Sequence, residues 1–369
     1  MSAVSALAGG VFGATVADDE TAELRQLVED IGHRSLEARF GHRGRPEQID
    51  DALWRNLEDT GLARLTSTPD LGAGPTELAV VLRGLARHAC AVPLAETDLL
   101  AAWLGAKAGL TLPHAGRLTV AIADATLGDG RITGTATDVP WTRASAAIVV
   151  AARTSEALYV GSVPTEDVEI EDGHNLAGEP RDRVDFDLPA ERFRAVDPSV
   201  DAELVRRGAW ARCVQIIGAM DTAAELSVAH TRQRVQFGRA LSKFQSVQHA
   251  LAAMAGESER ARAATTMAVA AASDYGFDTT QTDYAVTVAK VVLGRVVGPV
   301  TTIAHQLHGA IGVTAEHQLW LATMRAQSWV TEFGSTAHHA RRLGRMALSA
   351  ENPWDIIIGQ PNRSEKEKK

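Results

Sequence analysis

An arginine and a glutamine flank a short break between two long helical patterns, in the segment from His230 to Gly256. Arg234 precedes the break at Phe237-Gly238, and Gln245 follows it. A guanidinium can hold a phosphate through two parallel hydrogen bonds, and a glutamine amide can satisfy polar atoms beside it. The residue types thus suit an anion-binding turn. Taken alone, they favour the simpler interpretation of Arg234 as one half of a surface ion pair.

A second segment, from Ala304 to Trp320, joins two helical patterns through two glycines. It begins with Gln306, and Gly309 and Gly312 follow at short intervals. Glycine permits positive φ and lets the backbone approach a ligand closely. The alternative is an ordinary glycine cap at the end of a helix.

The sequence gives little indication of a metal-binding site. Histidines crowd the last third of the chain, but their spacing within helices gives no metal-binding set joined to carboxylates; they are His305, His308, His317, His338 and His339. His308, beside the glycine turn, is better explained as a packing or hydrogen-bonding residue. Cys90 and Cys213 are too few for a disulfide framework or a zinc site, which favours a reducing compartment.

The elements that must position these residues divide the chain into regions. From Asp19 to Leu112 the apolar residues recur at helical spacing, which predicts an N-terminal helical domain over residues 1–112. Short alternating runs separated by Gly, Pro and Asp then predict a middle β domain, a small sheet or barrel, over residues 113–198.

Long helical patterns return after Asp197-Pro198, and they predict helices over roughly 202–234, 244–273, 281–308 and 315–348. Four such helices favour a four-helix bundle over residues 199–350, followed by a charged tail over 351–369. The expected fold is therefore mainly α with a middle β domain.

Composition excludes several classes of function. The 37 basic and 46 acidic residues give a net charge of −9, which would repel a polyanion, so nucleic acid is not an expected partner. The N-terminal segment lacks a basic region, and no run reaches the roughly 18 apolar residues that span a bilayer. We therefore expect a cytoplasmic protein without a membrane segment.

The segment around Arg234 resembles the acyl-CoA dehydrogenase pattern of Arg, two residues, Phe-Gly, six residues and Gln. The second segment is similar to the family's Gln-x-x-Gly-Gly-x-Gly turn, with Ala310 where the second Gly is usual. In that family both segments cross a subunit interface to the pyrophosphate and adenosine of the neighbour's FAD. The resemblance implies FAD as cofactor and a set of binding residues, namely Arg234, Phe237, Gln245, Gln306, Gly309 and Ala310.

The resemblance extends over the whole chain, because the family has the same order of helical domain, β domain and four-helix bundle. It is strongest from about 210 to 325. It implies an acyl-CoA substrate and a homo- or hetero-oligomer, either a dimer or a tetramer. Electron-transfer flavoprotein is a further partner consistent with it.

The middle domain departs from the family. The Thr-Glu-Pro…Gly-Ser-Asp loop, whose groups contact the isoalloxazine and the thioester, has no counterpart here. The family's Trp-Ile-Thr strand is replaced near Asp138-Val139-Pro140, with Trp141 displaced. Trp141 could stack on a flavin, and it could equally be a core aromatic.

The family's reaction needs a carboxylate that removes the α-proton of the thioester while the flavin accepts the β-hydride. The family's Tyr-Glu-Gly-Thr step most resembles the segment 331–335 here, which makes Glu332 the candidate base. The alternative is a solvated Glu on a bundle helix. A second family position falls near Gly208, where there is no carboxylate, and Glu203 is more than a turn away.

Two functions follow from the resemblance. The chain is either an FAD-dependent subunit that oxidises an acyl-CoA to the 2,3-enoyl-CoA, or a non-catalytic partner that completes the FAD site of another polypeptide. The second function explains donor motifs beside a reduced middle domain, as in the heteromeric acyl-CoA dehydrogenases of actinobacterial steroid degradation. A third interpretation, a helical protein without flavin, treats both motifs as packing turns.

Overall fold

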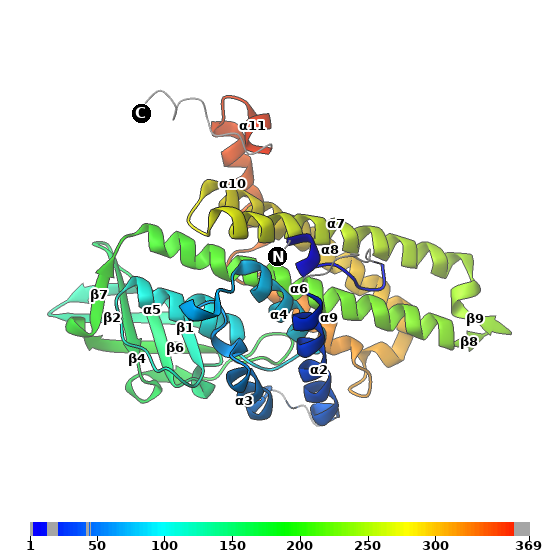
Figure 1. Ribbon diagram of the computed structural model, residues 1–369, viewed down its shortest axis with the longest axis horizontal. Helices are drawn as coiled ribbons and strands as arrows, with labels where there is room; N and C mark the ends of the chain where they lie inside the picture. The colour runs from blue at the N-terminus through cyan, green and yellow to red at the C-terminus, as the bar shows by residue number, and fades with distance from the viewer. Residues whose placement is uncertain (1–2, 13–20, 42–43, 45, 358–369) are drawn as a thin grey trace.

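The computed structural model describes residues 3–12, 21–41, 44 and 46–357. Helices, a sheet and further helices follow one another along the chain, as expected (Figure 1). The sheet lies at one end of an elongated molecule, and a long helical bundle extends to the opposite end (Figure 1). Most of the charged tail that the sequence predicts over 351–369 lies outside the described residues.

The first region is a layer of helices packed against the bundle. Its elements are α1 (Ala3–Ala6), α2 (Ala22–Arg39), α3 (Asp51–Asp59), α4 (Pro75–Arg87), a π-helical segment η3 (Ala95–Ala102) and α5 (Trp103–Lys107). Local signals set the helix starts. Asp50 caps α3 by accepting the Leu53 N–H at 2.9 Å, and Pro75 occupies the first turn of α4.

The middle region is an open mixed sheet in the order β5-β6-β2-β1-β3-β4-β7. Its strands are β1 (Leu118–Gly128), β2 (Arg131–Pro140), β3 (Ala147–Arg153), β4 (Leu158–Val163), β5 (Glu169–Glu171), β6 (Arg181–Pro189) and β7 (Phe193–Val196). Asp129 and Gly130, both at positive φ, form the tight turn between β1 and β2. The register of β2 shifts between Ala136 and Val139, which is where the sheet faces the bundle loop described below.

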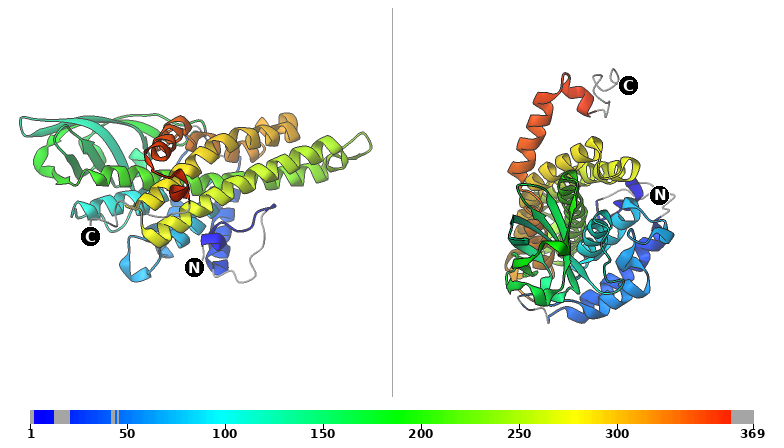
Figure 2. Two further views of the ribbon diagram at one scale, coloured as in Figure 1. Left: turned by 90° about the horizontal axis from the view of Figure 1, so that it is seen from above. Right: turned by 90° about the vertical axis from the view of Figure 1, so that its left-hand side faces the viewer.

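The bundle contains α6 (Ser199–Gln233), α7 (Gln245–Tyr275), α8 (Thr280–His308) and α9 (Leu319–Trp329). The prediction of one continuous helix over 315–348 is wrong. Phe333 and Gly334 both adopt positive φ, at 53° and 107°, and this ends the helical path. The chain then leaves the bundle as α10 (Thr336–Ser349) and α11 (Pro353–Ile357), which project from the body (Figure 2).

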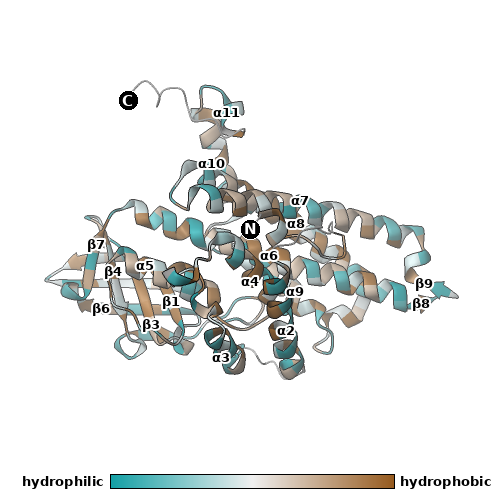
Figure 3. Cartoon of the chain, viewed as in Figure 1, coloured by the Kyte–Doolittle hydropathy of each residue, from teal (hydrophilic) through white to brown (hydrophobic). Residues whose placement is uncertain are grey.

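One hydrophobic core connects the three regions. It combines Trp54 and Leu82 of the first layer, Val149 of the sheet, and Trp210 and Val296 of the bundle. Figure 3 shows the apolar colouring of β1 and β3 and the hydrophilic β8–β9 hairpin at the far tip of the bundle. The segment Thr280–Val313 is long and apolar enough to cross a membrane, but 56% of its apolar window is buried inside the protein, as in a core helix.

Candidate active site

A cleft of about 760 Å³ lies between the sheet and the bundle. Asp138 and Pro140 of β2 line one side, and Glu332 and Phe333 of the loop after α9 line the other. The tertiary structure thus brings together the two segments that the resemblance predicts beside the flavin ring and at the base. The volume lies within the range of small-molecule and cofactor sites.

The cleft offers little free positive charge. Arg153 and Arg181 are the arginines that line it. Arg153 pairs with Asp201 at 2.8 Å, and Arg181 pairs with Glu332 at 2.8 Å. Both guanidinium groups are therefore committed to protein carboxylates rather than available to a pyrophosphate.

Glu332 is held between two arginines. Its Oε1 accepts from Arg181 Nε at 2.9 Å, and its Oε2 accepts from Arg212 Nε at 2.6 Å. The side chain is 15% exposed, whereas those of Arg181 and Arg212 are 4% and 2% exposed. The alternative of a solvated Glu on a bundle helix is therefore wrong, because both carboxylate oxygens are used in buried ion pairs.

These pairs set the protonation of Glu332. Burial by itself raises the pKa of the carboxyl, but Arg181 and Arg212 outweigh burial and bring the pKa to about 2. A general base works best with a pKa near the working pH, and its lone pairs must reach the proton. Geometry and charge both oppose Glu332 as the base in this arrangement.

The ion pairs continue into the N-terminal layer. Arg212 donates to Glu96 at 2.5 Å, and Arg181 lies 3.3 Å from Glu179, whose other oxygen lies 3.4 Å from Arg325. Among these groups only about 20 Å³ of open volume remains, between α4, η3 and α6. That space is about the size of one water molecule, so the junction is filled by the protein's own side chains.

Trp141 belongs to this filled junction. It is 4% exposed and lines the small cavity together with Trp329. Its backbone has a φ of 54°, an uncommon conformation for a bulky residue. Of the two interpretations of Trp141, the core aromatic agrees with its position.

Lys290 of α8 holds the loop that carries Glu332. Its Nζ donates to the carbonyl oxygens of Val330 and Glu332, each at 2.7 Å. The Lys290 side chain is buried, and this burial lowers its pKa to about 8. The loop is therefore fixed through its backbone as well as through the Glu332 side chain.

The first predicted anion-binding segment lies at the opposite tip of the bundle. Arg234 follows the last residue of α6, and a two-stranded hairpin follows, β8 (Val235–Gln236) and β9 (Arg239–Ala240). Phe237 and Gly238 form its turn, both at positive φ, and Phe237 is 91% exposed. Arg234 is exposed and has no ion-pair partner among the described residues. Its charge is therefore available.

The second segment meets the first at the same tip. Gln306 lies in the last turn of α8, and Gly309 and Ala310 begin a 3₁₀ turn, Gly309–Val313. All three residues are exposed. His308 stacks on His230 of α6 with ring centroids 4.6 Å apart, which holds the ends of α6 and α8 together. His308 thus packs between helices, as predicted, and no metal-binding group occurs within the described residues.

The cleft beside Glu332 and the bundle tip that carries Arg234 are far apart within one chain. The β8–β9 hairpin and the sheet stand at opposite ends of the molecule in two orthogonal views (Figures 1 and 2). Arg234, Gln245 and the Gly309 turn therefore have no access to the cleft beside Glu332 in the same chain. Any ligand that contacts both sets must lie between two subunits.

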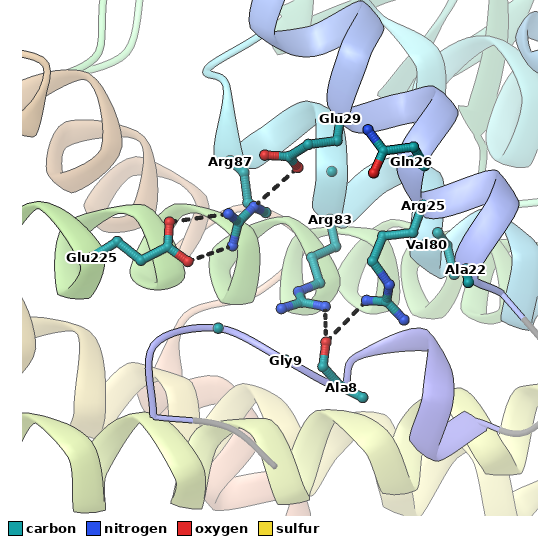
Figure 4. A pocket seen from close by; sticks show the side chains of 12 residues that line it. Ala8, Gly9, Ala22, Arg25, Gln26, Glu29, Val80, Arg83, Arg87 and Glu225 are labelled. Atoms are coloured by element: carbon teal, nitrogen blue, oxygen red, sulfur yellow. Dashed lines mark hydrogen bonds and ion pairs between the residues drawn. The ribbon is translucent and has the colours of Figure 1, made fainter. Parts of the chain in front are cut away.

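A further cavity of about 420 Å³ lies between α2, α4, α6 and the N-terminal segment (Figure 4). Arg83 donates to Asp221 at 2.8 Å and to the Ala8 carbonyl at 2.6 Å, and Arg87 pairs with Glu225 at 3.0 Å. The cavity contains none of the predicted site residues, and its arginines bond to the protein's own carboxylates and to the Ala8 carbonyl.

Comparison with known proteins identifies a family model that matches part of the chain. Residues 200–348 match the family of acyl-CoA dehydrogenase C-terminal domains. The chain is similar over most of its length to acyl-CoA dehydrogenases, a family of FAD-dependent oxidoreductases.

Among its relatives is the acyl-CoA dehydrogenase IpdE2 of Mycolicibacterium smegmatis, 26% identical over 304 residues, which are 80% of this chain and 87% of the relative. The ChsE4-ChsE5 complex of Mycobacterium tuberculosis has a similar fold, with a TM-score of 0.79, 23% identity and coverage of 92% of this chain and 99% of that one. A Tcur3481-Tcur3483 steroid ACAD variant aligns with a TM-score of 0.78 and 25% identity, covering 89% of this chain and 98% of that one. Some of these similar proteins are thus heteromeric.

Proposed function

We propose that this chain is the partner subunit of a heteromeric acyl-CoA dehydrogenase and completes the FAD site of another polypeptide. In this role it supplies Arg234 to the pyrophosphate, with Gln245 and Gln306 beside it. The subunit that holds the flavin would carry the base. The overall reaction would be oxidation of an acyl-CoA thioester to the 2,3-enoyl-CoA, in which bound FAD accepts the hydride.

The observation that carries this proposal is the pairing of Glu332 with Arg181 and Arg212. A carboxylate in two ion pairs at 2.6 and 2.9 Å is a poor acceptor for a substrate proton. On the side of the N-terminal layer, the junction around Arg181 and Arg212 leaves only about 20 Å³ of open volume. The donor residues, in contrast, are exposed and uncommitted, which is what a ligand on a neighbouring subunit requires.

The tip of the bundle that carries Arg234, Phe237, Gln245 and the Gly309 turn, here called the donor tip, has side chains that suit a diphosphate. Arg234 supplies a guanidinium that has no ion pair within the part of the chain that the structure describes. Gln245 begins α7, where the helix end places unsatisfied N–H groups and partial positive charge. Phe237 offers an exposed aromatic surface beside them. These groups would bind and orient the cofactor, and none of them needs to exchange a proton.

The second candidate is that the chain itself oxidises the acyl-CoA with Glu332 as base. The cleft of about 760 Å³ beside Glu332 favours it, because the size suits a cofactor. This candidate requires that Arg181 and Arg212 release the carboxylate when substrate binds. It also requires that the same cleft hold the acyl chain as well as the cofactor.

The two candidates are separated by purifying tagged chain from its native host and, separately, alone from a heterologous host. We expect the isolated chain to lack stoichiometric FAD and to reduce no dye with acyl-CoA. We expect FAD and activity only in a complex with a second acyl-CoA dehydrogenase polypeptide. Arg234→Ala should lower the FAD content of that complex, while Glu332→Gln should leave its turnover unchanged. A yellow, active homomer that Glu332→Gln inactivates would overturn the proposal.

Substrate class and further partners follow as parts of the proposal. The likeness to a steroid ACAD supports a bulky, steroid-derived acyl group on the CoA thioester. Electron-transfer flavoprotein would reoxidise the flavin, and the enzyme would act in the cytoplasm. A panel of fatty acyl-CoA and steroid-derived acyl-CoA substrates given to the complex tests the first of these.

A further inference from the structure

Three histidine rings from different elements pack against one another at the donor tip. The ring centroid of His308 in α8 lies 4.6 Å from that of His230 in α6 and 4.8 Å from that of His317, which precedes α9. His308, in the middle, is buried, and the two outer rings are partly buried. We call these three residues the histidine stack.

The histidine stack is joined to the backbone that carries the donor residues. The Arg234 N–H donates to the His230 carbonyl at 2.8 Å, so the position of Arg234 follows that of His230. Gly309 follows His308 directly in the chain. Gly312 packs on the same histidine, because a β-carbon at Gly312 would come within 2.9 Å of the His308 Cβ. The stack therefore sets where Arg234 lies relative to the Gly309 turn.

The hydrogen bonds of the stack require a neutral outer ring. The Leu319 N–H donates to His317 Nδ1 at 3.1 Å. A backbone N–H can only donate, so this Nδ1 carries no proton and the His317 ring is uncharged. In the middle ring, Nδ1 lies 2.8 Å from the Ala304 carbonyl oxygen and donates to it. A proton added to His317 Nδ1 would break the bond from Leu319.

The titratable and charged groups that act on the stack are all basic. They are the three rings themselves, His305 of α8 and Arg234 of α6. None of the three rings pairs with a carboxylate within the residues that the structure describes. Burial and the neighbouring cations lower the pKa of both outer rings, and burial lowers the pKa of His308 although two backbone carbonyl oxygens oppose it. Acidification would therefore place like charges on rings that touch.

From these contacts we propose that the histidine stack is a positioning element of the donor tip, which holds Arg234 and the Gly309 turn in place only while its rings are uncharged. The part of this inference that concerns the flavin rests on the proposed function. Protonation would drive the ends of α6 and α8 apart, and the donor residues would lose the arrangement that a diphosphate needs. FAD binding should then weaken in acid. Charge attraction alone predicts the opposite, because imidazolium groups would attract a diphosphate.

Hydrogen exchange of the isolated chain tests the stack without flavin. After correction for the intrinsic rate, exchange in residues 226–245 and 304–320 should be at least about tenfold faster at about pH 5.5 than at about pH 7.5. His308→Phe keeps an aromatic ring between the outer histidines but takes up no proton, so its exchange should change by less than about threefold.

Two further variants complete this experiment. His317→Asn keeps an acceptor for the Leu319 N–H and does not titrate, so it should also reduce the response to acid. His114→Phe removes an exposed histidine in the loop before β1 and is the matched control, which should respond as the wild type does. Circular dichroism checks that each variant is folded.

The heteromer tests the effect on the cofactor, through flavin fluorescence at the same two pH values. The FAD dissociation constant should rise at least about tenfold in acid for the wild type and less than about threefold for His308→Phe. Tighter FAD binding in acid, or an equal response to acid in the wild type and both stack variants, would reject the inference. If Arg234→Ala leaves the FAD content unchanged at neutral pH, the proposed function fails, and the exchange measurement still decides whether the stack holds the tip.

Discussion

At the level of single residues, the chemistry of this chain depends on what surrounds Glu332. A carboxylate that lies between two buried guanidinium groups stabilises the junction of three regions rather than removing a proton. The same loop is fixed by Lys290 through backbone carbonyls. Because the pKa values of Glu332 and Lys290 are both shifted, both side chains should change how the stability of the protein depends on pH.

Glu332→Gln should destabilise the protein by about 2–4 kcal/mol at neutral pH, because two buried guanidinium groups each lose one of their two carboxylate partners. The folded-state pKa of Glu332 is about 2 against an ordinary 4.5, so its stabilisation is present above about pH 4.5. It is lost as pH falls from about 4.5 to 2. Urea unfolding of both proteins should show their difference shrinking over this range. A constant difference would mean that the pairing is not electrostatic.

Lys290→Met should remove a pH dependence on the alkaline side. The pKa of Lys290 is lowered from 10.5 to about 8 by burial, so between these values the unfolded chain binds more protons than the folded one. The contribution of Lys290 to stability therefore rises with pH from about 8 to 10.5, by roughly 3 kcal/mol in full. Chemical denaturation at about pH 8 and about pH 10 tests this. Equal pH dependence in the variant would contradict a buried ammonium.

At the level of elements, the β8–β9 hairpin is built against local preference. A two-residue turn with both residues at positive φ favours Asn-Gly, and here Phe237 occupies the first position. The aromatic side chain is 91% exposed, so it gains little packing to offset the unfavourable backbone. Such strain at an exposed tip supports a role in contacting a ligand or a partner.

Phe237→Asn should keep or raise the stability of the isolated chain, by up to about 1 kcal/mol, because Asn tolerates this conformation better. The same change should lower the FAD content of the heteromer. Thermal unfolding and the ratio of flavin to protein absorbance measure the two effects. Gly238→Ala is the comparison variant, since its positive φ predicts a loss of stability. Unchanged flavin content in Phe237→Asn would remove Phe237 from the proposed site.

At the level of the whole molecule, the three regions share one core and one network of ion pairs. Arg212 joins the bundle to Glu96 of the N-terminal layer, and Arg325 joins it to Glu47. The layers therefore stabilise one another. The donor tip and the cleft remain at opposite ends, which is why function is expected only in an assembly.

Urea unfolding of the isolated chain should accordingly follow a single transition. Far-UV circular dichroism reports on the helices, and tryptophan fluorescence reports on Trp54 in the first layer together with Trp210 and Trp329 in the bundle. The two signals should coincide. Glu96→Gln should lower the shared midpoint without splitting the transition. Separate transitions in the wild-type protein would show that the layers fold independently.

Local patterns in the sequence were enough to predict the order of helices, sheet and helices and to single out the turn around Arg234. Arg234, Phe237 and Gln245 lie within twelve positions of one another, so their association around one turn follows from their spacing. The break at Phe333 and Gly334 could not be predicted in this way. A change to positive φ does not alter the spacing of apolar residues in the flanking helices, so this spacing does not reveal the break.

The role of Glu332, in contrast, depends on packing between distant parts of the chain. Arg181 and Arg212 are 151 and 120 positions away from it, and no local pattern indicates which distant guanidinium groups a carboxylate meets. Those pairings arise when the sheet, the bundle and the N-terminal layer pack around one core. The sequence thus places a carboxylate at position 332, where the resemblance predicts one. Packing determines that this carboxylate is paired with two guanidinium groups.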